Sequence, residues 1–306
     1  MEHIWIPVSI FAALMQAVRT AAQKDLNQRM STMGTTYVRS IFGLPVMITY
    51  LVAVLLLVGG GAPRFRTDYL LYCFGGALAQ VLATALLIYM FRLKNFAVGT
   101  MLTKTDIVMT ALIGTFVFSE TITPKGWIAL VIVVLGVLML SAGRIGLAKL
   151  SSPGSSLLSS LVSWPTQVAL ACALLFTFSY LLLREATLTL GDQSYLWRGA
   201  WTVVVATGMQ VIFLGIWLLW KEPTVFGQLW PNRRISSFIG FTSALGSIGW
   251  FSAFALQNAS YVRAVGQVEV VFTLLISWLY FRERVSPLEL AGIVVTVAGI
   301  LLFRLL

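Results

Sequence analysis

The residues best suited to chemistry in this sequence are two acids and one base in strongly apolar surroundings. Asp106 and Glu269 each lie near the middle of an apolar stretch, and Lys104 comes two positions before Asp106. If these stretches cross a membrane, each charge costs roughly 2.5–3.5 kcal/mol on insertion scales and must face a polar interior or a partner. We therefore expect Lys104 to pair with Glu269 or Asp106. Such a cluster could recognise the carboxylate and amine of a substrate, or exchange a proton; a structural ion pair is the alternative.

The composition places these stretches in a membrane. Of the 306 residues, 58% are hydrophobic and only 10% are charged, and the mean hydropathy is +0.90. A soluble domain cannot cover that much apolar surface, because it needs a charged exterior. The formal charge of +10 comes mostly from Lys and Arg in short loops beside the apolar stretches, as membrane topology requires. Nucleic acid is therefore not an expected partner, whereas the lipid bilayer is.

Ten apolar stretches are long enough to be transmembrane helices. They run at about 4–22, 35–58, 69–91, 96–118, 125–142, 166–189, 195–220, 235–257, 261–281 and 287–305. The predicted fold class is therefore an all-α integral membrane protein with ten transmembrane helices. Residues 143–163, rich in Ser and containing Pro153, form the predicted linker between a first five-helix unit, residues 1–142, and a second, residues 164–306.

The two halves are related by an internal repeat. A shift of 163 positions places Leu93–Met139 on Leu256–Leu302 without a gap. The matched polar and turn residues are Asn95 and Asn258, Thr110 and Thr273, Glu120 and Glu283, Pro124 and Pro287, and Gly136 and Gly299. Because five spans is an odd number, the second half must enter the membrane in the opposite sense to the first. The sequence thus predicts an inverted-topology repeat, which is common among secondary transporters.

Two loops of this repeat carry a family signature. The segments Phe118–Pro124 and Phe281–Gly292 both contain Glu-x-x-x-Pro, and they resemble the hairpin of the EamA repeat in the drug/metabolite transporter superfamily. Lys24 and Arg39 also fit the pattern of its first half. The resemblance implies a ten-helix carrier whose central cavity is lined by spans 1, 3, 4, 6, 8 and 9. Members of this family move amino acids, aromatic compounds, choline-like amines, nucleotide-like metabolites and sugars.

Two indications of orientation disagree. Loops on the side of the membrane opposite the termini contain twelve Lys and Arg residues, and loops on the side of the termini contain six. Because cytoplasmic loops carry the excess of basic residues, this count predicts that the termini lie outside the cell. The family resemblance instead implies that both termini are cytoplasmic. Both orientations therefore stay open, as does the oligomeric state.

Polar and aromatic side chains on several spans are candidates for lining the cavity. The candidate substrate-binding residues are Gln16, Arg19, Gln80, Thr84, Tyr89, Thr103, Lys104, Asp106, Tyr180, Ser243, Ser247, Trp250, Gln267, Glu269 and Thr273. The candidates for proton coupling are Asp106 and Glu269. Arg19 lies near the end of its span, so snorkelling to the interface is its alternative. Tyr180 and Trp250 could stack on an aromatic or cationic ligand, with core packing as the alternative.

The loop acids Glu120 and Glu283 are interpreted as structural residues at an interface. Beside the second of them, Ser286 is followed by Pro287 and then by Glu289, which predicts a capping box with proline at the first helical position. Small and polar residues recur at helical spacing on spans 4 and 9, where they would permit close packing or leave room for a ligand.

The function that these features predict is secondary transport in a bacterial-type inner membrane, not catalysis. His3 is the only histidine, no enzyme motif appears, and no metal or cofactor is expected. The first hypothesis is a small zwitterionic or cationic metabolite, such as an amino acid or amine, moved by alternating access with proton coupling and exported. A second is a larger organic anion, nucleotide-like, on which Arg19, Arg39 and Arg263 would converge. A third is a structural or lipid-handling membrane protein.

Overall fold

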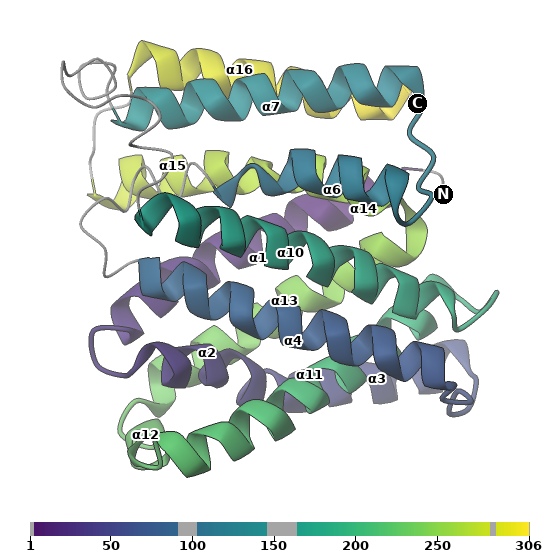
Figure 1. The fold of residues 1–306 in the computed structure, drawn as a ribbon, viewed down its shortest axis with the longest axis vertical. Helices are drawn as coiled ribbons and strands as arrows, with labels where there is room; N and C mark the ends of the chain where they lie inside the picture. The colour runs from purple at the N-terminus through teal and green to yellow at the C-terminus, as the bar shows by residue number, and fades with distance from the viewer. Residues whose placement is uncertain (1–2, 91–102, 146–163, 282–285, 306) are drawn as a thin grey trace.

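The computed structural model describes residues 3–90, 103–145, 164–281 and 286–305, and every secondary-structure element in these ranges is helical (Figure 1). Within them, seven spans are long and apolar enough to cross a membrane. They are α1 (Trp5–Leu26), α2 and α3 together (Thr32–Ile41 and Leu44–Val58), α4 (Thr67–Met90), α7 (Pro124–Ile145), α10 (Trp164–Leu188), α11 (Tyr195–Lys221) and α13 (Arg233–Leu256). These correspond to the first three, the fifth and the sixth to eighth predicted stretches.

The other predicted stretches are not single long helices in the described part of the chain. Stretch 4 contains α6 (Asp106–Phe116), and its residues 96–102 lie outside the described ranges. Stretch 9 is divided into α14 (Ala259–Gly266) and α15 (Val268–Phe281). Stretch 10 contains α16 (Pro287–Leu302), whose 16 residues are followed by the short 3₁₀ helix η1 (Phe303–Leu305).

Helical interruptions fall at repeat-related positions of stretches 4 and 9. Lys104 and Thr105 form a turn directly before α6, and Gln267 separates α14 from α15. Lys104 and Gln267 are 163 positions apart and are therefore equivalent in the repeat. Each interruption places an acid in the first turn of the next helix, Asp106 in α6 and Glu269 in α15. A carboxylate at that position is stabilised by the partial positive charge of the helix N-terminus.

A third interruption, between α2 and α3, marks a close crossing. A Cβ atom on Gly43 would lie 3.1 Å from the carbonyl oxygen of Gly240 in α13, and one on Gly240 would lie 2.5 Å from the carbonyl carbon of Phe42. Only glycine at both positions lets the two backbones meet. Pro45 follows at the start of α3, where its missing N–H leaves no helical bond unmade.

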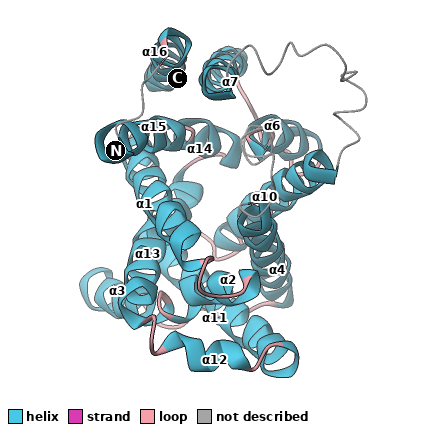
Figure 2. Ribbon diagram, turned by 90° about the vertical axis from the view of Figure 1, so that its left-hand side faces the viewer, coloured by secondary structure: helices cyan, strands magenta, loops and turns pink. Residues whose placement is uncertain are grey.

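The elements of stretches 5 and 10 form a separate outer pair. Figures 1 and 2 show α7 and α16 side by side at one edge of the molecule. A Cβ on Gly136 would lie 2.5 Å from the nitrogen of Thr296, and one on Gly299 would lie 2.9 Å from the nitrogen of Val133. The two matched glycines of the repeat thus bring these helices together, as small residues do in membranes.

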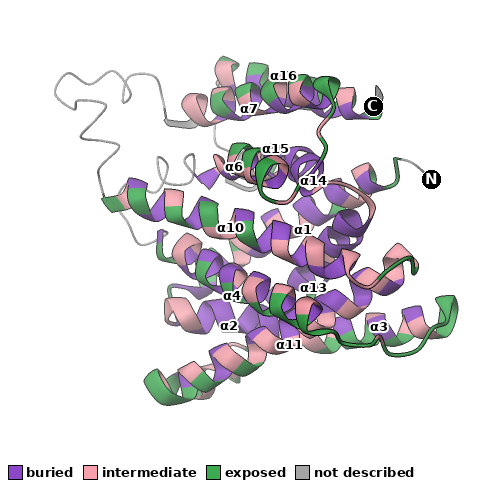
Figure 3. Cartoon of the chain, turned by 45° about the vertical axis from the view of Figure 1, so that its right-hand side comes forward, coloured by how far each residue is buried: buried purple, intermediate pink, exposed green. Residues whose placement is uncertain are grey.

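Below this pair, two columns of helices face each other (Figure 2). One contains α1 and α13 and the other contains α4 and α10, with each pair in extensive contact. Figure 3 shows buried residues concentrated on α13 and α14. Large apolar residues such as Leu57 (85% exposed) and Phe116 (81% exposed) cover the outside, as expected for lipid-facing surfaces.

The ends of several helices differ from the prediction. Helix α1 continues to Leu26, four residues further than expected, and α7 continues to Ile145, three residues into the predicted linker. The remainder of the linker lies outside the described residues. Helix α12 (Thr224–Leu229) was not predicted. The capping box of Ser286 and Glu289 at the start of α16 is confirmed.

Candidate functional site

A small cavity of about 20 Å³ lies between the two helix columns. Its walls come from α1, α2 and α4 of the first half and from α10 and α13 of the second. The lining residues are Gln16, Arg19, Arg39, Gln80, Phe176, Tyr180, Leu183, Ser247, Trp250, Phe251 and Phe254. Six of them, Gln16, Arg19, Gln80, Tyr180, Ser247 and Trp250, are residues that the sequence nominates for substrate binding. The cavity therefore has a polar wall and an aromatic wall, which the two halves build together.

Arg39 is the most firmly held residue of the polar wall. Its guanidinium donates one hydrogen bond of 2.8 Å to Gln80 Oε1 and another of 2.8 Å to Thr84 Oγ1. The Oε1 atom of Gln80 also accepts a 2.7 Å bond from Gln210 Nε2 on α11, and Gln210 accepts one from Ser40. Every partner of Arg39 in this network is neutral, so its position is fixed while its charge remains.

Arg19 is the second cation of the polar wall. Its side chain does not snorkel to an interface, because the residue is only 6% exposed. It lies one turn after Gln16 on α1, on the face that borders the cavity. Its Nε atom is buried without a hydrogen-bond partner among the described residues. Arg19 and Arg39 line the same small cavity, so two guanidinium groups border one hollow.

The opposite wall is a continuous array of aromatic rings. Phe176 and Tyr180 are stacked with centroids 5.7 Å apart, Tyr180 lies 5.9 Å from Phe254, and Trp250 lies 6.2 Å from Phe254. These residues occur at helical spacing on α10 and α13, so each helix presents one aromatic face to the cavity. Gly266 is needed for this arrangement, since a Cβ there would lie 2.5 Å from the Trp250 ring.

Glu269 lies behind the cavity and is connected to it through Gln16. Gln16 Nε2 donates a 2.8 Å hydrogen bond to Glu269 Oε2, and Gln16 Oε1 accepts a 3.0 Å bond from Trp250 Nε1. Lys104 Nζ lies 3.5 Å from the same Glu269 oxygen. This is one of the two pairings expected for Lys104. The chain from Trp250 through Gln16 links a cavity wall directly to the carboxylate.

Asp106 belongs to a tighter ion pair. Its Oδ2 atom lies 2.7 Å from Arg263 Nη2, and both side chains are almost fully buried, at 3% and 2% exposure. The Arg263 guanidinium lies 4.3 Å from the centroid of Tyr180 and 5.2 Å from that of Trp250, so cation–π contacts supplement the ion pair. The sequence placed Arg263 only two residues inside stretch 9, but α14 begins at Ala259 and buries it.

The remaining predicted site residues do not line the cavity. Thr84 binds Arg39, and Thr273 donates a hydrogen bond to the Glu269 carbonyl within its own helix. Thr103, Ser243 and Gln267 are buried. Tyr89 does not belong to the site, because it lies on the exposed face of α4. It follows Gln80 by nine positions, which rotates it by about 180° to the opposite side of the helix.

The sequence-based assignment missed residues that the structure brings into the site. Arg39 was used for the family resemblance and the organic-anion hypothesis but was not among the candidate binding residues, and Gln210, Phe176 and Phe254 were not selected. Arg39 carried the same signal that selected Asp106, a charge within an apolar stretch. Gln210 is likewise a polar residue in the interior of α11 and is only 1% exposed.

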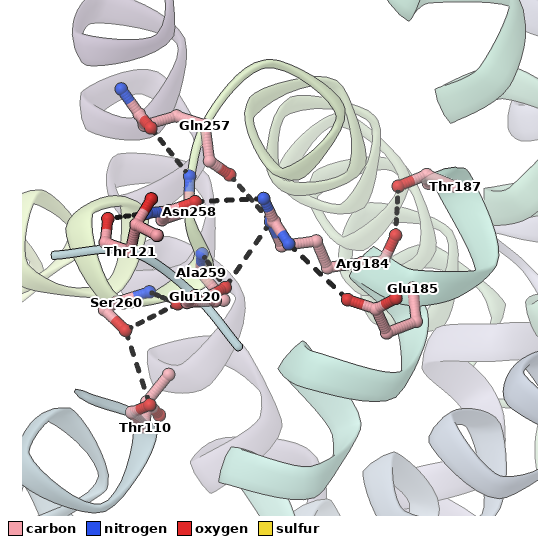
Figure 4. Close-up of polar contacts among 10 residues, drawn as sticks. All are labelled: Thr110, Glu120, Thr121, Arg184, Glu185, Thr187, Gln257, Asn258, Ala259 and Ser260. Carbon is pink, nitrogen blue, oxygen red and sulfur yellow. Dashed lines mark hydrogen bonds and ion pairs between the residues drawn. The ribbon is translucent and has the colours of Figure 1, made fainter. Parts of the chain in front are cut away.

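A second polar network joins the halves away from the cavity (Figure 4). Glu120 Oε1 accepts a 2.8 Å hydrogen bond from the Ala259 nitrogen, and Glu120 Oε2 accepts a 2.7 Å bond from Ser260 Oγ. The Glu120 carboxylate thus caps the start of α14. Arg184 lies 3.4 Å from Glu120 and donates a 3.0 Å bond to Asn258 Oδ1. This geometry agrees with the structural interpretation of Glu120; Glu283 lies outside the described residues.

Comparison with known proteins gives two findings. The model of the EamA-like transporter family matches residues 3–142 and again residues 163–305. A solved structure named only "Crystal structure of protein" aligns with a TM-score of 0.70 over 99% of this chain and 96% of its own length, at 13% sequence identity. At that identity the similarity shows a shared fold alone. A search of curated proteins gave no match.

Proposed function

Because the chain belongs to the EamA-like transporter family of the drug/metabolite transporter superfamily, with two copies of its repeat, we propose that it moves a small polar metabolite by alternating access. The family consists of transporters and not of enzymes. Membership makes the chain a multi-pass integral membrane protein and points to secondary transport. We further propose that the protein lies in a bacterial-type inner membrane and exports its substrate.

The proposed architecture has ten membrane crossings arranged as two inverted five-helix repeats, residues 1–142 and 164–306, joined by the linker 143–163. In this arrangement α2 and α3 form one crossing, and α14 and α15 form another. Interrupted helices are a recurrent feature of inverted-repeat carriers, in which they provide helix ends at the substrate site. The interruptions at Lys104 and Gln267 support this arrangement.

The observation that carries the proposal is a polar cavity built jointly by both repeats. Arg19 and Arg39 come from the first repeat, and Tyr180 and Trp250 come from the second. If the two repeats rock against each other, a site between them opens to each side of the membrane in turn. A structural or lipid-handling protein would have no need to bury two arginines around a hollow, since charge inside a membrane is costly.

Substrate selection by this cavity favours a molecule with an anionic group. A zwitterionic amino acid satisfies that condition, and so does an organic anion, whereas a simple amine does not. The hollow of about 20 Å³ holds only one or two water molecules in this conformation, so its volume does not separate a small metabolite from a larger one. The two arginines support a metabolite that carries a carboxylate or another anionic group.

Proton coupling is assigned to Glu269 in preference to Asp106. Glu269 is bonded to the cavity residue Gln16, whereas Asp106 is fixed by Arg263. The charged and titratable groups that act on Glu269 are Lys104, Arg19, Arg263 and Tyr180. Protonation of Glu269 would release Lys104 and weaken the Gln16 contact, and so couple a proton to the cavity wall. The variant Glu269→Gln should abolish transport or remove its dependence on pH; unaltered transport would reject this role.

A labelling experiment tests alternating access without knowledge of the substrate. Both native cysteines are buried and can be replaced by alanine (Cys73→Ala, Cys172→Ala). A Ser247→Cys variant in that background should react with a membrane-impermeant maleimide added from either side of sealed vesicles. Ser9→Cys is the matched control, because Ser9 is fully buried on α1 and should not react. Reaction of the Ser247→Cys variant from one side only, or from neither, would contradict the proposal.

A further inference from the structure

We propose that the transported substrate is a small organic carboxylate with a flat apolar body, whose carboxylate binds between Arg19 and Arg39 and whose body lies on the aromatic wall. This inference rests on the proposed function and specifies its substrate class. It is carried by three observations: the charge around the cavity, the state of the two arginines, and the form of the facing wall.

The charge around the cavity is unbalanced. Among the described residues, four cations are present there, Arg19, Arg39, Lys104 and Arg263, against the two carboxylates of Asp106 and Glu269. Arg263 is paired with Asp106 and Lys104 with Glu269, so each carboxylate already has a cation at ion-pair distance. In this part of the structure the excess positive charge therefore lies at Arg19 and Arg39, which both line the cavity.

The two arginines are prepared for an anion in different ways. Arg39 is 5% exposed and is held by Gln80 and Thr84, which fix the guanidinium without neutralising it. Arg19 is 6% exposed, has no ion pair within 4 Å among the described residues, and has an unpartnered Nε. A buried charge without a counter-charge is strongly unfavourable, and the planar guanidinium fork matches a carboxylate in particular. An anion between them would relieve the mutual repulsion.

The facing wall determines what the rest of the substrate can be. Apart from Ser247, the lining residues on α10 and α13 are Leu183 and five aromatic side chains, with stacked or tilted rings. A flat apolar body gains most from such a wall through ring stacking and burial of apolar area. An extended polyol or a second strong charge would find few partners there. In this conformation the hollow holds only one or two water molecules, so a ring enters it only when the two repeats move apart.

The experiment uses a set of ligands that share one ring and differ in charge. Benzoate, benzamide and benzylamine are anionic, neutral and cationic. We expect benzoate to raise the unfolding temperature of the detergent-purified full-length protein in a saturable way, because ligands of the folded state stabilise it by mass action. Benzamide and benzylamine should give no saturable shift. Inorganic phosphate, which supplies negative charge without a ring, should act more weakly than benzoate.

Variants locate the site. Arg19→Gln and Arg39→Gln should each weaken benzoate binding by about tenfold or more, as loss of a charged hydrogen bond implies. Arg198→Gln is the matched control: it is the arginine that opens α11 in the second half, and it does not line the cavity. If a Gln variant does not fold, Arg39→Lys keeps the charge but loses the fork and should give a smaller loss of binding.

Several outcomes would overturn the inference. They are a benzamide or benzylamine shift as large as that of benzoate, benzoate binding indifferent to both arginines, a phosphate shift exceeding that of benzoate, and no shift with any anion. Saturable binding of benzylamine together with two-sided labelling of the Ser247→Cys variant would overturn only the substrate class. One-sided labelling would overturn the transporter proposal itself.

Discussion

Asp106 and Glu269 hold equivalent places in the two repeats, but the structure gives them different surroundings. Both stand in the first turn of a helix that follows an interruption, and both form an ion pair with a cation from the opposite repeat. The cations themselves are not equivalent. Lys104 corresponds to Gln267 in the second repeat, and Arg263 corresponds to Thr100 in the first.

This difference separates an anchoring pair from an adjustable one. The Asp106–Arg263 distance is 2.7 Å, and neither side chain is more than 3% exposed. The Lys104–Glu269 distance is 3.5 Å, the side chains are 21% and 12% exposed, and Glu269 shares its oxygen with the cavity residue Gln16. The duplicated hairpin has thus kept its acids and changed their cations. One acid then holds the repeats together, and the other can respond to the cavity.

The largest effect is expected from breaking the anchoring pair. Asp106→Ala leaves Arg263 charged and buried, which should lower the free energy of unfolding by about 3–5 kcal/mol. Denaturant unfolding in detergent measures this change. Replacing both partners (Asp106→Ala with Arg263→Leu) should recover much of the loss, because no unpaired charge remains. A single Asp106→Ala variant as stable as the parent would show that the pair does not anchor the fold.

A smaller loss of unfolding free energy is expected from weakening the contact of Glu120 with α14 of the other repeat. Glu120→Gln weakens the cap on α14 and removes the ion pair with Arg184, which should cost about 1–2 kcal/mol of unfolding free energy. Glu185→Gln is the matched control, since Glu185 also pairs with Arg184, at 3.5 Å, but caps no helix. Its effect should stay within about 1 kcal/mol. Equal losses in the two variants would show that the cap contributes nothing.

Changing the adjustable pair should affect function more than stability. Glu269→Gln keeps a hydrogen-bonding group for Gln16 and leaves Lys104 partly accessible to water. We therefore expect a loss of only about 1 kcal/mol in unfolding free energy. Uptake into vesicles measured across a pH series should at the same time lose its pH dependence. A destabilisation as large as that of Asp106→Ala would remove the distinction between the two pairs.

The smallest effect is expected from making the repeats alike at the interruption. Lys104→Gln gives the first repeat the residue found at position 267 of the second. Glu269 keeps its bond to Gln16 and the nearby charge of Arg19, so the unfolding free energy should change by less than about 1 kcal/mol. Thermal unfolding with and without benzoate measures it, and benzoate binding should persist. Loss of benzoate binding would assign Lys104 to the site.

The helices were predictable to the extent that hydropathy determines them. Long apolar stretches need a membrane and must satisfy their backbone hydrogen bonds internally, so α1, α4, α10 and α13 follow from composition. The interruptions depend on tertiary contacts instead. The break before Leu44 had a local signal in Gly43 and Pro45. The break at Gln267 had no proline, and Gly266 directly before it was only a weak local signal, because a single glycine is often tolerated inside a helix.

The site was predictable in its chemistry but not in its geometry. Intramembrane charge pointed to Asp106, Glu269 and Lys104, and the structure shows two separate ion pairs there, Lys104 with Glu269 and Asp106 with Arg263. As site residues, Arg39 and Arg263 were assigned only to the organic-anion hypothesis, because each stands close to a predicted helix end, where a displacement of a few residues moves a side chain from interface to core. Tyr89 shows a different limit. Composition marks a residue as polar and aromatic, but helical phase decides the side on which it lies.

The most direct test of Glu269 as the link between proton and cavity measures the labelling of the Ser247→Cys variant from each side of the membrane across a pH series. We predict that this cysteine is labelled from both sides and that the ratio of the two labelling rates shifts with pH. Adding Glu269→Gln should remove the shift. Adding Asp106→Asn should preserve the shift in the fraction of that variant that folds. A pH-dependent shift that survives Glu269→Gln would contradict the assignment of the adjustable pair to proton coupling.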